Sequence, residues 1–75
     1  MGHDPFTMRP KRNLALKLAI VMLGKRQREI AHRAEMTDSV LSQIILGYRP
    51  PSPEQRKRLA RVLGKPESEL FSGTL

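Results

Sequence analysis

The stretch that decides the fold runs from Gln27 to Gly47 and reads QREIAHRAEMTDSVLSQIILG. Its first part places three apolar residues at the i, i+1, i+4 spacing of one helical face: Ile30, Ala31 and Ala34. The two alanines are small, so a second helix can cross close to the first. We therefore expect a short helix here, followed by a tight turn into another helix.

The second part of the stretch carries the signals for the start and end of that next helix. Thr37 can cap it, because the side-chain oxygen accepts from a free backbone N–H in the first turn, and Asp38 places a negative charge at the positive end of the dipole. Gly47 can adopt a positive φ and end the helix. The apolar stripe consists of Val40, Leu41, Ile44 and Ile45. The sequence predicts a helix over residues 38–46 with this stripe buried.

Short polar side chains lie between the apolar positions of this helix. The four that we interpret as base-reading residues are Asp38, Ser39, Ser42 and Gln43. Gln43 is the strongest candidate, because its amide can bond adenine through two hydrogen bonds, whereas the two serines discriminate less. Asp38 can accept from a cytosine amine, or it can remain engaged at the helix cap. Leu46 can contact a thymine methyl group or belong partly to the core.

The same stretch resembles the helix-turn-helix of the phage-repressor (Cro/XRE-like) DNA-binding family. The matching residues are Gln27, Ala31, Met36, Thr37, Leu41, Gln43, Ile44 and Gly47. The following segment, GYRPPSPEQRKRLARVLGKPESELF, is similar to the fourth and fifth helices of that family, so the resemblance covers residues 14–71. Two departures concern the first helix and the turn: Arg26 stands where the family often has a Ser or Thr cap, and Glu35 where it often has Gly.

The resemblance implies an all-α, compact five-helix, lambda-repressor-like domain with a central helix-turn-helix at residues 27–47. It further implies a sequence-specific regulator of transcription, more often a repressor, that reads the major groove of double-stranded DNA with the helix 38–46. Family members place two copies on a palindromic operator, and we expect a weak homodimer that DNA strengthens. The alternative is a protein-interaction module, or an antitoxin-type partner-binding protein, on the same fold.

Two groups of residues are candidates for the phosphate backbone. They are Lys25, Arg26, Gln27 and Arg28 at the start of the first motif helix, and Tyr48 and Arg49 after the second. Free N–H groups and the dipole at a helix start favour an anion, and in the family a glutamine at the place of Gln27 bonds a phosphate. The loop after Gly47 is stiffened by Pro50 and Pro51, and in the family this loop contacts the sugar-phosphate backbone.

The region before the motif contains an unusually apolar helix. We set residues 1–8 apart as a leader or disordered arm, so the domain covers residues 9–75. Arg9, Lys11 and Arg12 form a basic arm that either lies along DNA or is a frayed end. A helix over residues 14–23, with Lys17 as its single charge, is predicted between Asn13 and Gly24. Such a helix is either buried on several faces, which we favour, or pairs one stripe with a second subunit.

The region after the motif begins with a capping box at Ser52–Gln55, with Pro53 at the first helical position. The predicted helix ends at Leu63 before Gly64, and its buried stripe is Leu59, Ala60 and Leu63. A last helical turn follows Pro66, and we expect Phe71 to cover the aliphatic core. We also consider Leu70 and the C-terminal tail as a surface through which two copies could pair.

Composition restricts the function classes. The 75 residues suffice for one small domain, and the net charge of +7 favours a polyanion as partner. The chain has no Cys, which fits a reducing, cytoplasmic compartment, and its longest apolar run, residues 18–23, is too short to span a membrane. It has no thiol nucleophile, phosphate-binding glycine pattern or paired carboxylates in a plausible cleft, and His32 has no second ligand at metal spacing. We expect neither catalysis nor a metal, cofactor or small-molecule ligand.

Overall fold

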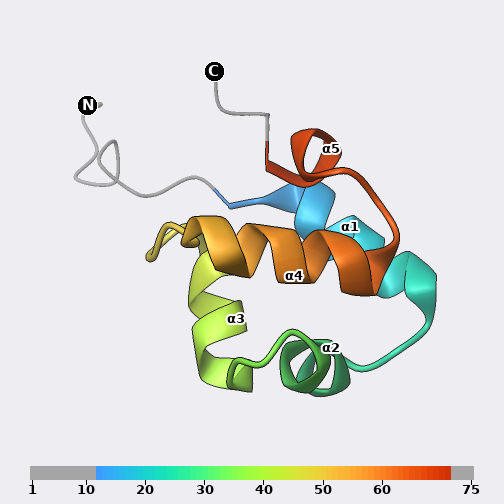
Figure 1. Ribbon diagram of the computed structural model, residues 1–75. Helices are drawn as coiled ribbons and strands as arrows, with labels where there is room; N and C mark the ends of the chain where they lie inside the picture. The colour runs from blue at the N-terminus through green and yellow to red at the C-terminus, as the bar shows by residue number, and fades with distance from the viewer. Residues whose placement is uncertain (1–11, 72–75) are drawn as a thin grey trace, which may run out of the picture.

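The fold consists of α-helices throughout residues 12–71, the part of the chain that the computed structural model describes. In chain order the helices are α1 (Leu14–Leu23), α2 (Gln27–Arg33), α3 (Asp38–Leu46), α4 (Pro53–Leu63) and α5 (Glu67–Phe71). Helix α4 crosses the middle of the domain, with α1 packed behind it and α2 and α5 on opposite sides (Figure 1). This confirms the all-α expectation; the predicted leader, Arg9 and Lys11 lie outside the described residues.

The helix boundaries follow from local capping chemistry. Thr37 Oγ1 accepts from the Val40 N–H at 3.1 Å and begins α3 as predicted. The capping box of α4 is complete, because Ser52 Oγ accepts from the Gln55 N–H at 3.1 Å and Gln55 Oε1 accepts from the Ser52 N–H at 2.9 Å. Gly47 ends α3 with φ +86°, a conformation that glycine adopts without steric cost.

Asn13 joins the start of α1 to two other helices. Its Oδ1 accepts from the Leu16 N–H at 2.9 Å, which caps α1. Its Nδ2 donates to the Leu70 carbonyl at 2.9 Å, and its backbone N–H donates to the Ile45 carbonyl at 2.7 Å. The cap predicted from sequence is therefore also the point at which α1, α3 and α5 are tied together.

Every helix contributes one large, fully buried side chain to a single aliphatic core. These five residues are Leu16, Ile30, Leu41, Leu59 and Leu70. Phe71 is half-buried and packs against this core, whereas Leu70 is the residue of α5 that lies inside it. Leu70 therefore cannot itself form a surface for pairing, and that part of the suggestion was wrong; the C-terminal tail, residues 72–75, lies outside the described residues. Val40 and Ala60, which we expected to be buried, are half-buried at the margin of the core.

Helix α1 is buried on one side only. Leu16, Ala19 and Ile20 face α3, α4 and α5, as helical periodicity requires. Large side chains of the opposite face remain exposed, namely Leu14, Leu18, Val21 and Met22, and Leu23, at the end of the buried side, is 40% exposed. The expectation that this helix is buried on several faces was wrong, because its neighbours cover only one of its sides. At ten residues α1 is also short, and no helix among the described residues is long and apolar enough to cross a membrane.

The turn between α2 and α3 contains a residue in an uncommon conformation. Glu35 has φ +61° and is the single non-glycine residue with positive φ in residues 12–71. It occupies the place where the resembling family often has Gly, and a side chain in this region costs about 1 kcal/mol. The turn is held on both sides of Glu35, because Ala34 is fully buried and the Met36 N–H donates to the Ala31 carbonyl at 2.9 Å. The tight turn thus forms without glycine.

Candidate nucleic-acid interface

Helix α3 presents a polar face opposite its buried stripe. Leu41, Ile44 and Ile45 are buried, and they fix the rotation of the helix about its axis. The four predicted base-reading residues therefore lie away from the core: Asp38 and Ser39 are exposed, and Ser42 and Gln43 are half-exposed. Hydrogen-bonding groups on an accessible helix face are what base-edge recognition in a major groove requires.

The two motif helices are linked by a side-chain hydrogen bond at their N-terminal ends. Gln27 Nε2, at the start of α2, donates to Asp38 Oδ1, at the start of α3, at 3.0 Å. An amide nitrogen carries two hydrogens, so Gln27 retains one donor for a phosphate oxygen. Asp38 in turn retains its second carboxylate oxygen as an acceptor. The contact fixes the positions of a predicted phosphate ligand and a predicted base reader relative to each other.

A second contact joins the middle of α3 to the loop after it. Arg49 Nε donates to Gln43 Oε1 at 2.9 Å, and the backbone N–H groups of Tyr48 and Arg49 both donate to the Gln43 carbonyl. Gly47 reverses the chain here, so that the loop folds back over the last turn of α3. Gln43 keeps a free amide N–H₂ and one acceptor site, while the other nitrogens of Arg49 remain available.

The predicted phosphate ligands fall into two groups at opposite ends of α3. At the start of α2, Arg26 and Arg28 are exposed, and Lys25 Nζ lies 3.8 Å from a carboxylate oxygen of Glu29. Arg26 is the N-cap of α2 but makes no side-chain capping bond. The loop after α3 supplies Arg49, described above, together with the exposed ring of Tyr48, which lies beside it in the chain. Cationic and hydrogen-bonding groups thus flank the polar face of α3.

Most of the acidic residues are paired with basic residues, and Asp38, at the start of α3, instead accepts a hydrogen bond from Gln27. Five of the carboxylates in residues 12–71 form ion pairs with basic residues: Glu29, Glu35, Glu54, Glu67 and Glu69. Most of these pairs lie on α4, α5 and the outer side of α2. Within the described residues, Arg26, Arg28 and Arg49 take part in no such pair. An approaching polyanion therefore meets uncompensated charge near α3.

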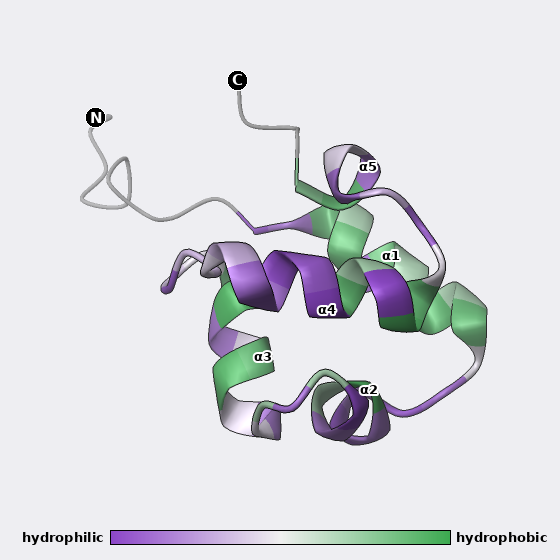
Figure 2. Cartoon of the chain, viewed as in Figure 1, coloured by the Kyte–Doolittle hydropathy of each residue, from purple (hydrophilic) through white to green (hydrophobic). Residues whose placement is uncertain are grey.

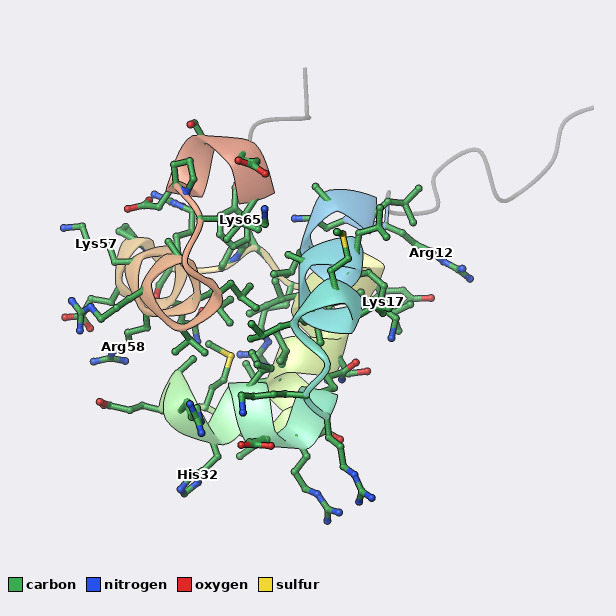
Figure 3. The ribbon with its side chains drawn as sticks, turned by 90° about the vertical axis from the view of Figure 1, so that its right-hand side faces the viewer. Arg12, Lys17, His32, Lys57, Arg58 and Lys65 are labelled. Atoms are coloured by element: carbon green, nitrogen blue, oxygen red, sulfur yellow. The ribbon has the colours of Figure 1, made fainter. Side chains whose placement is uncertain are left out.

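Arg12 is a basic residue whose place near the loop could not be read from the sequence. It lines, together with Arg49 and Leu14, an open groove of about 510 Å³ between the start of α1 and the loop after α3. Figure 3 shows Arg12 and Lys17 projecting from the α1 side of the domain, away from Lys57 and Arg58 on the α4 side. The sequence marked Arg12 as part of a basic arm, but only the packing of α1 against α3 brings it to the groove shared with Arg49.

Comparison with known proteins identifies the class to which this fold and this polar helix belong. A family model described as Helix-turn-helix, of the XRE type, matches residues 16–70. The chain belongs to this family, whose members are DNA-binding transcriptional regulators. The resemblance stated from the motif residues is thereby confirmed. No curated protein matches the chain.

The fold of this chain is also similar to the solved structure of one particular protein. The chain is similar to the restriction-modification controller protein C.AhdI from Aeromonas hydrophila, with a TM-score of 0.75 and 25% sequence identity. The match covers 92% of this chain and 100% of that chain. The five-helix arrangement is therefore shared over almost the whole length of both proteins.

Replacing Arg26 with serine is expected to change stability and DNA affinity in opposite directions. A serine N-cap supplies the side-chain acceptor that α2 lacks, which raises the free energy of unfolding by about 0.5–1 kcal/mol. Removing the cation lowers affinity for all duplexes alike and reduces the salt slope of binding by about one unit. Urea denaturation and binding titrations at several salt concentrations measure the two effects. Arg61→Ser on the exposed side of α4 is the control, and an unchanged slope in Arg26→Ser would show that Arg26 only faces solvent.

Proposed function

We propose that this DNA-binding regulator is sequence-specific and reads the major groove with α3. Helix α2 crosses the phosphate backbone, and Ser39, Ser42 and Gln43 contact base edges, with the free oxygen of Asp38 as an additional acceptor. The observation that carries this proposal is the polar, accessible face of α3, which is flanked at both ends by arginines without ion pairs in residues 12–71. The family match supports DNA binding itself.

Affinity and specificity come from two kinds of side chain, which are the charged residues and the amide and hydroxyl residues. Affinity comes from ionic contacts with phosphates, made by Lys25, Arg26, Arg28 and Arg49. These contacts are the same for every sequence, because all duplexes carry the same phosphates. Gln27 adds a donor to the phosphate backbone of DNA, and its hydrogen bond to Asp38 fixes the position of this donor. Specificity comes from the amide and hydroxyl groups of α3. The protein acts as a binding protein without catalytic activity, a metal or another cofactor.

Two copies bind one operator in this proposal. One recognition helix covers only a few base pairs, which is too little selectivity for a genomic search. Two copies related by a two-fold axis read half-sites about one helical turn apart, so that the operator is palindromic. Such a protein bound across a promoter excludes polymerase, and repression is the regulatory role that we propose. The controller protein C.AhdI, to which this chain is similar, is itself named for a regulatory role.

The test combines salt dependence with selection of sites. Affinity for random duplex DNA is measured at several salt concentrations, and bound sequences are then selected from a random pool. A steep decrease of affinity with salt, together with a selected motif of two-fold symmetry, is the expected result. Absence of binding to any duplex at low salt would contradict the proposal and favour the alternative, a partner-binding module that uses the exposed apolar face of α1.

A further inference from the structure

The groove between the start of α1 and the loop after α3 has a volume of about 510 Å³ and is open to solvent. Its walls are largely apolar, and its charged groups are two arginines; among the residues that line it are Leu14, Ile44, Pro51, Phe71, Arg12 and Arg49. Figure 2 shows that α1, which contributes one wall, is green over most of its length, whereas the visible side of α4 is largely purple. A concave apolar site of this size with a few polar groups is typical of sites for small organic ligands.

The walls of the groove are held in place before any ligand binds. Asn13 lines the groove and ties α1 to α3 and α5, because its backbone N–H donates to the Ile45 carbonyl at 2.7 Å and its Nδ2 donates to the Leu70 carbonyl at 2.9 Å. On the other side, Pro50 and Pro51 fix the backbone φ of the loop. Binding in the groove therefore requires little ordering of the protein, which favours a ligand that makes only a few contacts.

The charge of the groove selects an anion. Arg12 and Arg49 both line it, and no Asp or Glu of the described residues does so. Neither arginine takes part in an ion pair within residues 12–71, and Arg49 donates to another side chain there only through its Nε, which bonds Gln43. A guanidinium binds a carboxylate through parallel hydrogen bonds and also stacks on an aromatic ring. The ligand that matches the arginines and the apolar walls together is a carboxylate on an aromatic body.

We propose that this groove binds a small aromatic carboxylic acid, with its carboxylate on Arg12 and Arg49 and its ring against the apolar walls. The proposal departs from the sequence-based expectation that no small-molecule ligand binds, because the groove is made by residues from three separate parts of the chain. Arg49 is also a phosphate ligand in the proposed function, so the acid and DNA compete for one guanidinium. Each therefore lowers the affinity for the other by the same factor. This competition rests on the proposed function, whereas binding of the acid does not.

The first test is a titration of the isotope-labelled protein with phenylpropionate, followed through the backbone amide signals by NMR. Shifts are expected at groove residues such as Ala15, Gly47 and Phe71, with a dissociation constant of about 1 mM for a ligand of this size. The neutral analogue phenylpropionamide should bind at least about tenfold more weakly, because it lacks the charge that the arginines bind. Arg12→Gln should weaken binding of the acid at least about fivefold. Arg61→Gln, the same change on the exposed side of α4, should leave binding unchanged.

The second test measures the competition with DNA. Affinity for a random duplex is determined with the groove saturated by phenylpropionate and with the same concentration of phenylpropionamide, at equal ionic strength. The acid should lower the affinity about fivefold relative to the amide, because it withdraws one guanidinium from the phosphates. The loss should be smaller in Arg12→Gln, which binds the acid more weakly.

Three results would overturn the inference. Equal binding of the acid and the amide would show that the arginines do not select the ligand. Shifts spread over the whole surface, or unchanged by Arg12→Gln, would place binding outside the groove. An unchanged affinity for DNA with the groove saturated would exclude competition for Arg49. If the chain without ligand binds no duplex, the proposed function fails, and the NMR titration still decides by itself whether the groove binds the acid.

Discussion

Replacing Gln43 with alanine is expected to weaken binding to the preferred operator by about 1–3 kcal/mol and to remove the preference at one base pair. The amide lies on the accessible face of α3, and its nitrogen donates to no other side chain within residues 12–71, so it can donate to a base edge. Losing that donor affects the preferred sequence more than random DNA. Titrations with the selected duplex, its single-base variants and a random duplex measure the difference.

The contact with Arg49 makes a second effect of this substitution measurable. Gln43 Oε1 holds Arg49 Nε at 2.9 Å, so the alanine variant also releases the guanidinium from its fixed position. If Arg49 binds a phosphate, this release weakens all duplexes by the same amount. The loss that comes from releasing Arg49 is separated by a double-mutant cycle, in which Gln43→Ala is also measured in an Arg49→Ala background. In that background there is no Arg49 side chain to release. Gln43→Ala should still remove the preference at one base pair in the Arg49→Ala background.

Equal losses of Gln43→Ala on the selected and random duplexes, measured with Arg49 present, would contradict a base-reading role for Gln43. The residue would then act only by positioning Arg49. In that case the cycle would show that nearly the whole effect of Gln43→Ala disappears once Arg49 is absent. The same titrations thus separate recognition of a base from support of a phosphate ligand.

The features that the sequence predicted well are those determined by neighbours in the chain. Caps such as Thr37 and Ser52 act on backbone groups three residues away, and Gly47 ends α3 through its own φ. The buried stripe of α3 follows from helical periodicity alone. Boundaries of α1, α3 and α4 could therefore be derived from residue type and spacing without knowledge of the packing.

Features that depend on tertiary contacts could not be derived in this way. Nothing in a pattern of spacings indicates that Gln27 Nε2 reaches Asp38, eleven residues later, or that Arg49 folds back onto Gln43. The exposure of Leu18 depends on how many helices cover α1, and an apolar sequence does not report the number of neighbours. Leu70 and Phe71 are adjacent and both apolar, and only the register of α5 on the core decides which one is buried.

A large loss of stability is expected when the core beneath α3 is altered. Leu41→Ala is expected to lower the free energy of unfolding by about 2–5 kcal/mol, because the leucine is fully buried and its removal leaves a cavity. A domain of this size has little stability to spare, so the variant will be partly unfolded at 37 °C. Urea denaturation should show a lower midpoint with an unchanged slope.

The matched control is Leu18→Ala, which makes the same chemical change on the exposed face of α1. At concentrations where the chain is monomeric, this variant should change stability by no more than about 0.5 kcal/mol, because alanine is a good helix former and Leu18 is already 57% exposed. If Leu41→Ala leaves too little folded protein, Ile44→Val provides a milder core change of about 0.5–1.5 kcal/mol. Equal effects of Leu41→Ala and Leu18→Ala would mean that the stripe of α3 does not anchor the helix. The orientation of its polar face toward DNA would then lose its physical basis.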